Sequence, residues 1–289
     1  MRWFASGLVV LLLTLSASPA RAGASGGWAL LPPPPSLWAP QSEGRVDHDG
    51  ARIWYASFGD PASTQGPPVV LLAPGDASSD IWGNQVPALV ADRHRVVVID
   101  SRGAGRSSWD GRLGYERMAG DVIAVLDAAG IGQADIVGWS DGAIVALVVA
   151  MQHPERVRRV FAFGANMDVG GLDPLGLFAP VLPYAAALTK DEYARDTGSA
   201  AGFAALAAAT RRMQLTQPHY SAAQLAAIVG PAVAIADGDR DELISRRHTE
   251  YLARTIPHAR LVWLPHAGHF APLQAPGAFN AAMLTFLDR

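Results

Sequence analysis

The residues best suited to chemistry lie in a G-x-S-x-G motif, Gly138-Trp139-Ser140-Asp141-Gly142. A β-branched run ending at Val137 precedes the motif, and an apolar run over residues 143–149 follows it. This context predicts a sharp strand-to-helix turn that exposes the serine hydroxyl and brings helix N–H groups beside it. A second copy of the motif, at residues 23–27, has no predicted strand before it and no apolar helix after it. We therefore interpret Ser140 as a nucleophile rather than as a simple helix cap.

The base that must accept the serine proton is expected among the last histidines of the chain. His269 lies in Gly268-His269-Phe270, shortly after a predicted strand at residues 260–264, and so belongs in a loop at the active edge of a sheet. His266 follows the same strand and is the main alternative. His258 precedes the strand, which predicts a position at the opposite edge. We predict that His269 is the base.

The acid that orients the base is expected after a predicted strand at residues 233–236, where four carboxylates follow: Asp237, Asp239, Asp241 and Glu242. Asp237 is suited to capping the turn at Gly238, and Asp239 to facing solvent, which are common roles of aspartate in loops. Asp241 is then the predicted acid. An acidic cluster can also indicate a metal site. Beyond these four residues, however, the surrounding sequence offers no nearby histidine and no further carboxylate to complete a set of ligands. We expect no metal.

The elements that position these residues alternate along the chain. Short apolar runs bounded by Gly, Pro or Asp predict strands at 51–58, 68–72, 95–99, 135–137, 157–163, 233–236 and 260–264. Helical stretches fall near 84–92, 115–129, 141–152, 246–256 and 275–287. This alternation predicts an α/β fold, with a mostly parallel central sheet covered by helices on both faces. Residues 167–228 lack strand signals and predict an inserted helical lid over the edge where ligands bind.

The amino-terminal segment is unlike the rest. Residues 1–22 combine Arg2, a short apolar run and the sequence Ala20-Arg21-Ala22, which predicts a cleaved signal peptide and no stable membrane anchor. Residues 23–43 are rich in Gly, Pro and Ser and predict a flexible tether to a single domain at 44–289. We therefore expect a periplasmic or secreted protein, of bacterial source.

Composition limits the classes of partner and chemistry. The formal net charge is −3 and only 17% of residues are charged, which gives no reason to expect a nucleic-acid partner. The chain has no cysteine, which excludes disulfides, a cysteine nucleophile and thiolate metal sites. The expected partner is a small-molecule substrate.

These motifs together resemble the α/β-hydrolase superfamily, over about residues 44–289. The resemblance rests on the ordered set Pro68–Leu72, Asp100–Ser107, the Ser140 turn, Gly238–Asp241 and Gly268-His269. It implies a Ser140–Asp241–His269 triad, and a structural role for the Asp100–Ser107 turn. Gly-Trp-Ser-Asp-Gly, with Gly164-Ala165-Asn166, is similar to the biphenyl-hydrolase-like branch, which includes amino-acid-ester hydrolases. That branch also carries an Asp at the position of Asp141.

One motif departs from the family pattern. Where the family commonly has His-Gly after its third strand, this chain has Ala73-Pro74. In the family, one oxyanion-hole N–H comes from the residue after the nucleophile, here Asp141, and a second comes from this loop. Aligned without a gap, the family pattern places the second N–H at Gly75. An alignment shifted by one residue places it at Asp76. Pro74 has no N–H and cannot serve.

The function predicted from the sequence is hydrolysis of a small carboxylic ester through an acyl-enzyme, without a metal or organic cofactor. The carboxylates of Asp76 and Asp141 flank the predicted oxyanion site, so a cationic amine on the substrate would suit it. The alternative is that both side chains make loop hydrogen bonds. Trp139 is a further candidate for substrate contact. Lactone opening, C–C bond hydrolysis and perhydrolysis use the same triad, and a non-catalytic binding protein is the alternative of another class. Epoxide and haloalkane opening are disfavoured, because family members with those activities have Asp at the position of Ser140.

Overall fold

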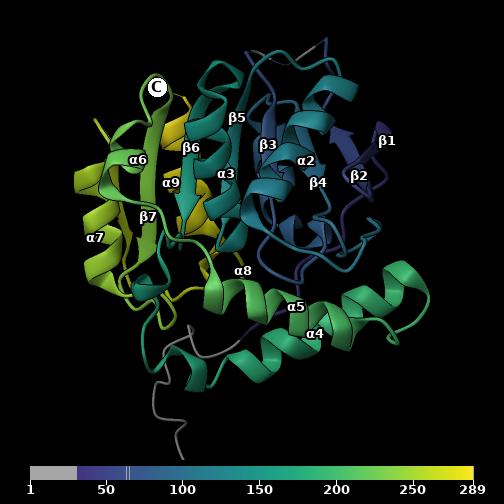
Figure 1. The fold of residues 1–289 in the computed structure, drawn as a ribbon. Coiled ribbons are helices and arrows are strands. Elements are labelled where there is room, and N and C mark those ends of the chain that lie inside the picture. Colours follow the sequence, from purple (N-terminus) through teal and green to yellow (C-terminus); the bar gives the residue numbers. More distant parts are fainter. Residues whose placement is uncertain (1–30, 63, 65, 289) are drawn as a thin grey trace, which may run out of the picture.

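An eight-stranded sheet forms the centre of the computed structural model, which describes residues 31–62, 64 and 66–288 (Figure 1). Its strand order is β1-β2-β4-β3-β5-β6-β7-β8. The first two strands pair antiparallel with each other, β2 pairs antiparallel with β4, and all other neighbours are parallel. The strands are β1 (Ser42–His48), β2 (Ala51–Phe58), β3 (Val69–Leu72), β4 (Val96–Ile99), β5 (Ala134–Trp139), β6 (Val157–Phe163), β7 (Ala232–Gly238) and β8 (Arg260–Leu264).

Burial on both faces explains the sequences of the central strands. Every residue of β3 (Val-Val-Leu-Leu) and of β4 (Val-Val-Val-Ile) is buried. Interior parallel strands face helices on each side, so they require a continuous apolar run rather than an alternating one. In β1, an edge strand, exposed and half-buried residues alternate instead. The predicted α/β fold with a mostly parallel sheet is confirmed.

Helices cover both faces of the sheet (Figure 1). One face carries α2 (Tyr115–Ala128), α3 (Asp141–Gln152), α6 (Ala222–Ala226) and α7 (Arg246–Thr255). The other face carries α1 (Gln85–Ala91) and α9 (Pro276–Leu287), which the short α8 (Ala271–Gln274) precedes. The side chains of α3 are buried from Asp141 to Ala150, because this helix lies between the sheet and α2. Of the described helices, none combines the length and apolarity needed to cross a bilayer.

Two long helices lie across one end of the sheet, α4 (Leu182–Thr197) and α5 (Phe203–Thr216) (Figure 1). They pack against each other and, with α6, occupy the segment 167–228 for which a lid is predicted. Glu192 of α4 is fully buried, and burial raises the pKa of its carboxyl to about 8. This carboxyl of the lid segment is therefore largely protonated at neutral pH.

The predicted signal peptide, residues 1–22, lies outside the described residues. The predicted tether is described only from Leu31, and residues 31–40 form no helix or strand. Leu31 and Leu37 nevertheless pack against the core, and the Trp38 ring lies 5.5 Å from that of Phe58. Strand β1 begins at Ser42, two residues before the predicted domain boundary at 44.

Glycine is required where β5 turns into α3. A Cβ atom added to Gly138 would lie 2.3 Å from the Gly142 carbonyl oxygen, and one added to Gly142 would lie 2.1 Å from that of Leu72. Both contacts are with backbone atoms, which cannot move aside as a flexible side chain would. The strand and helix therefore approach each other more closely than any larger residue permits.

We expect Gly142→Ala to destabilise the protein by roughly 1–3 kcal/mol, as overpacking of a tight site does. The control is Gly277→Ala in α9, where an added Cβ meets no atom within 4 Å. Because alanine favours helix, this control should be neutral or stabilising. Thermal denaturation of the two variants measures the difference. Equal melting temperatures for both variants would contradict the packing argument.

Candidate active site

Ser140 lies at the turn between β5 and α3, with φ 55° and ψ −120°. A non-glycine residue rarely adopts a positive φ, and here the surrounding hydrogen bonds impose it. The Ser140 N–H donates to the Phe163 carbonyl oxygen of β6 at 2.8 Å, and the Ser140 carbonyl oxygen accepts from the N–H groups of Ala143 and Ile144. The turn therefore lifts the hydroxyl out of the sheet at the carboxyl end of the parallel strands.

His269 and Asp241 are paired beside this turn. His269 Nδ1 lies 2.7 Å from Asp241 Oδ2, and the two side chains are each only 3% exposed. The other Asp241 oxygen accepts from the N–H groups of Leu243 and Ile244, at 2.7 Å each. Because three contacts hold the carboxylate, it fixes the orientation of the imidazole, whose ring lines the same cavities as Ser140.

The charges around His269 favour its protonated form. Burial opposes protonation, but the combined attraction of Asp241, Glu242 and Asp141 outweighs it and raises the pKa of the imidazole above its usual 6.5. Burial likewise acts to raise the pKa of Asp241, but the adjacent His269 and further hydrogen bonds hold it below its usual value. Asp241 is therefore ionised beside the histidine.

The other carboxylates of the cluster have distinct positions. Asp237 is fully buried at the end of β7, where it accepts from the Gly238 N–H and from the Thr249 hydroxyl at 2.7 Å. Burial, and then the nearby Asp241 charge, raise the pKa of Asp237 well above its usual value, which favours the protonated form of this carboxyl beside Asp241. Asp239 is exposed. Glu242 Oε2 accepts from the His269 backbone N–H at 3.0 Å.

The two rival histidines lie elsewhere. His266 is exposed, and its Nδ1 lies 3.5 Å from the Arg240 guanidinium. His258 is exposed just before β8 and lines a separate cavity formed by residues such as Pro231 and Arg260. Of the three histidines considered, the structure brings only His269 to Asp241 and Ser140.

Three backbone N–H groups near Ser140 are free to bind an oxyanion. Within the described part of the chain, those of Gly75, Asp76 and Asp141 donate no hydrogen bond. Gly75 lies so close to Asp141 that an added Cβ would be 2.5 Å from Asp141 Oδ2. The loop after β3 and the start of α3 therefore face one another beside Ser140, and both Gly75 and Asp76 are placed to offer a donor opposite Asp141.

The carboxylates of Asp141 and Asp76 both lie beside these donors. Asp141 accepts from the Tyr115 hydroxyl at 2.9 Å and from Gln214 Nε2 at 3.0 Å, so its partners come from α2 and the lid rather than from its own loop. Burial raises the pKa of Asp141 to about 6, against the effect of these two donors. Asp76 has a φ of 64°, and burial raises the pKa of its carboxyl too.

Trp139 is fully buried beneath the site. Its ring centroid lies 6.5 Å from that of His269 and 5.7 Å from that of Phe270, in an edge-on contact with the latter. The indole borders the smaller cavity described below. The ring also lies 6.1 Å from that of Trp82, so the indole packs between Trp82 and the histidine loop.

Two cavities meet at Ser140 and His269, with volumes of about 420 Å³ and about 330 Å³. The larger is bordered by the loop 166–177 and the smaller by Gly75, Asp76 and α4. Arg211 and Gln214 of α5 border both. Sequence reasoning did not identify these two lid residues or Tyr115, because they belong to no motif and reach the site only through folding.

Comparison with known proteins agrees with this geometry. A model of the alpha/beta hydrolase family matches residues 69–282. The chain belongs to that family. The RutD protein of Variovorax paradoxus, whose name assigns it to the carbamate hydrolases, is 30% identical over 244 residues, which cover 76% of this chain and 91% of the relative. Rhodomycin D methylesterase DnrP of Streptomyces peucetius is 27% identical over 82% of this chain and 95% of its own length.

Further matches support the same assignment. Epoxide hydrolase B of Mycobacterium tuberculosis is 41% identical over 131 residues, which span 44% of this chain but only 36% of the relative. The crystal structure of a hydrolase from Pseudomonas aeruginosa superposes with a TM-score of 0.68 at 26% identity, over 86% of this chain and 99% of that one. The protein is therefore an α/β-hydrolase and an enzyme of the hydrolase class.

The raised pKa of His269 predicts the pH dependence of hydrolysis. A general base must be neutral, so kcat/KM should fall as the pH drops through the imidazole pKa, with a midpoint above 6.5. Glu242→Gln keeps an acceptor for the His269 N–H and removes a nearby charge, which should move this midpoint to lower pH. Asp239→Asn, at an exposed carboxylate, is the control and should leave it unchanged. An unmoved midpoint in Glu242→Gln would contradict this electrostatic account.

Proposed function

We propose that this protein is an exported serine hydrolase that cleaves a small carboxylic ester through an acyl-enzyme intermediate. The observation that carries the proposal is the buried 2.7 Å contact between His269 and Asp241, beside a serine at a strained turn. Export rests on the predicted signal peptide. Amino-terminal sequencing of the exported protein should find the chain beginning after Ala22.

The proposed reaction has two halves. Ser140 Oγ attacks the ester carbonyl while His269 Nε2 accepts its proton, and Asp241 stabilises the resulting imidazolium. The N–H groups of Asp141 and of Gly75 or Asp76 bind the oxyanion. The imidazolium then donates its proton to the departing alkoxide, which leaves as the alcohol. In the second half, His269 deprotonates water, the water attacks the acyl-enzyme, and the acid is released with Ser140 restored.

Two features favour an ester among the substrates of such a triad. Ser140 borders two cavities with different further linings, the loop 166–177 in one and Gly75, Asp76 and α4 in the other, which suits a substrate with one group on each side of a reacting carbonyl. One relative aligned over most of its length is named a methylesterase. Lactones, C–C bonds and perhydrolysis are the alternatives within the same mechanism, to be separated by a substrate panel. Epoxide opening remains disfavoured because Ser140 occupies the position of the nucleophile.

The test of the mechanism is paired substitution. Ser140→Ala should lower kcat by at least about 10³-fold while the protein stays folded, because the remaining groups cannot form an acyl-enzyme. Asp241→Asn should cause a large loss, whereas Asp239→Asn, two residues away and exposed, should not. A fluorophosphonate probe should label Ser140. Retained turnover in Ser140→Ala, or a folded protein that the probe does not label, would favour another nucleophile or a non-catalytic binding protein.

The site also supports a narrower substrate class, an ester that bears a cationic amine. Asp141 and Asp76 bring two carboxylates beside the oxyanion donors, where their negative charge opposes development of the oxyanion. An ammonium group on the substrate would offset that charge. Each Asp141 oxygen accepts only one hydrogen bond, from Tyr115 or from Gln214. The carboxylate therefore keeps lone pairs that could accept from a substrate ammonium group.

For an amino-acid ester and its matched ester without the amine, we expect kcat/KM to favour the amine by at least about tenfold, a difference of about 1.4 kcal/mol. Asp141→Asn should remove most of this preference while hydrolysis of the neutral ester continues. An anionic ester belongs in the same panel, because Arg211 borders both cavities and makes no ion pair with any described residue. Equal kcat/KM for the amine and neutral esters would refute the amine proposal and leave the esterase proposal intact.

A further inference from the structure

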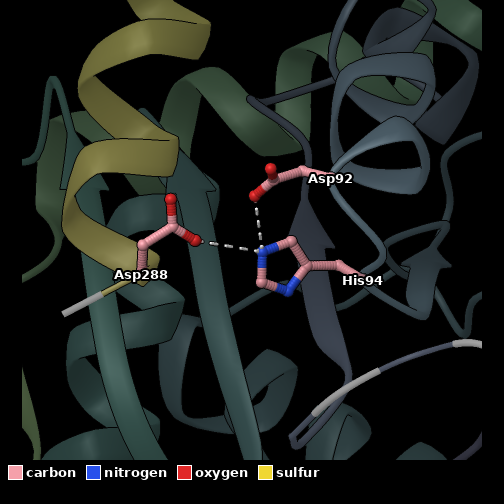
Figure 2. Close-up of side chains that lie close together, drawn as sticks. All are labelled: Asp92, His94 and Asp288. Carbon is pink, nitrogen blue, oxygen red and sulfur yellow. Dashed lines mark ion pairs between the residues drawn. The ribbon is translucent and has the colours of Figure 1, made fainter.

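Three side chains of types that can ligate a metal ion meet at the end of the sheet opposite the candidate active site. Asp92 follows α1, His94 precedes β4, and Asp288 follows α9. Figure 2 shows the two carboxylates pointing toward the same nitrogen of the His94 ring from different elements. His94 lies at the amino end of β4, whereas Ser140 and Asp241 follow the carboxyl ends of their strands. The cluster is therefore separate from the triad.

The spacing of the three ligand atoms fits a shared ion. His94 Nε2 lies 3.3 Å from Asp92 Oδ2 and 3.8 Å from Asp288 Oδ1, and all three atoms lie within 4.8 Å of one another. Ligands of tetrahedral zinc at about 2.0–2.1 Å from the metal lie about 3.3 Å from each other. A direct hydrogen bond between imidazole and carboxylate would be shorter, at about 2.7–3.0 Å. The His94–Asp92 separation matches that of zinc co-ligands, and the Asp288 carboxylate lies slightly farther away on an exposed side chain, which a small rotation would bring into reach.

The burial of His94 is an independent sign of a ligand. The residue is 8% exposed, and neither ring nitrogen has a hydrogen-bond partner among the described residues. Nε2 makes no hydrogen bond but faces the two carboxylates at ion-pair distance, and a cation held between them would satisfy the buried nitrogen and both anions. Asp92 and Asp288 have side chains that are 41% and 55% exposed, so an ion can enter from solvent and keep water in its remaining coordination position.

We propose that Asp92, His94 and Asp288 bind one divalent transition-metal ion, with zinc as the ion whose geometry fits best. Two carboxylates and a neutral imidazole balance the charge of a dication, and the imidazole favours zinc over calcium or magnesium. The ion joins the turn between α1 and β4 to the end of α9, two segments that are distant in sequence. Its role is structural, because it ties these elements together at the edge away from Ser140.

The experiment uses the full chain, freed of metal with a chelator and then titrated with zinc chloride. We expect uptake of one zinc per chain by calorimetry. At a zinc concentration about 100 times Kd, the melting temperature should rise by about 5 °C or more. Asp288→Asn and Asp92→Asn alter exposed ligands and should fold normally. Each should weaken zinc binding at least about tenfold and remove most of the rise.

The matched control is Glu155→Gln, which removes an exposed carboxylate 3.8 Å from His153, a pair that no third metal-ligating group joins among the described residues. This variant should bind zinc and gain stability as the unaltered protein does. The proposal is overturned if the unaltered protein takes up no stoichiometric zinc. It is also overturned if both aspartate variants bind zinc as tightly as Glu155→Gln, since the ion would then lie at another site. Neither result bears on hydrolysis, which is tested at Ser140.

Discussion

The close approach of β5, α3 and β3 around Ser140 is the constraint on which the site depends. Gly138 and Gly142 let the strand and the helix pack with backbone atoms nearly in contact, and the serine is left with a positive φ. A strained conformation of this kind persists only when the surrounding structure determines it fully. The same packing orients the Asp141 N–H and brings the loop of Gly75 beside it. The positions of the nucleophile and of the oxyanion donors are therefore both set by this packing.

A second constraint is the amount of negative charge gathered around one imidazole. Asp241, Glu242 and Asp141 all act on His269, while Asp237 sits behind Asp241 in its neutral form. Two ionised carboxylates close together at a buried site would repel each other strongly, which favours the protonated form of Asp237. Of these two carboxyls, Asp241 is the one that carries the charge; it is directed at the histidine and held in place by the backbone of Leu243 and Ile244.

The side chains at the two ends of the sheet have different functions. At the carboxyl edge, the lid helices α4 and α5 border both cavities and supply Gln214 to Asp141, so the shape of the substrate site depends on segments outside the triad. At the amino edge, no catalytic group is required, and the side chains there serve to join elements. The cluster of Asp92, His94 and Asp288 belongs to this second class, since it connects α1, β4 and α9.

The sequence by itself predicted seven of the eight strands, the helices between them, the turn at Ser140 and the family, but not the edge strand β1. These are local signals, because a strand buried on both faces needs a continuous apolar run and the turn needs small residues at fixed positions. The choice of Asp241 over Asp237 and Asp239 needed the family resemblance as well, since four carboxylates lie within six residues of one another.

Only the tertiary structure decided which side chains surround those residues. Tyr115 and Gln214 bind Asp141 across 26 and 73 residues of sequence, and His94 meets Asp288 from the far end of the chain. No sequence period or motif encodes such contacts, because they arise when separately formed elements pack against one another. The burial that raises the pKa of Asp141 and Asp237, and the carboxylates that raise the pKa of His269, are likewise properties of the packed molecule rather than of any segment of its sequence.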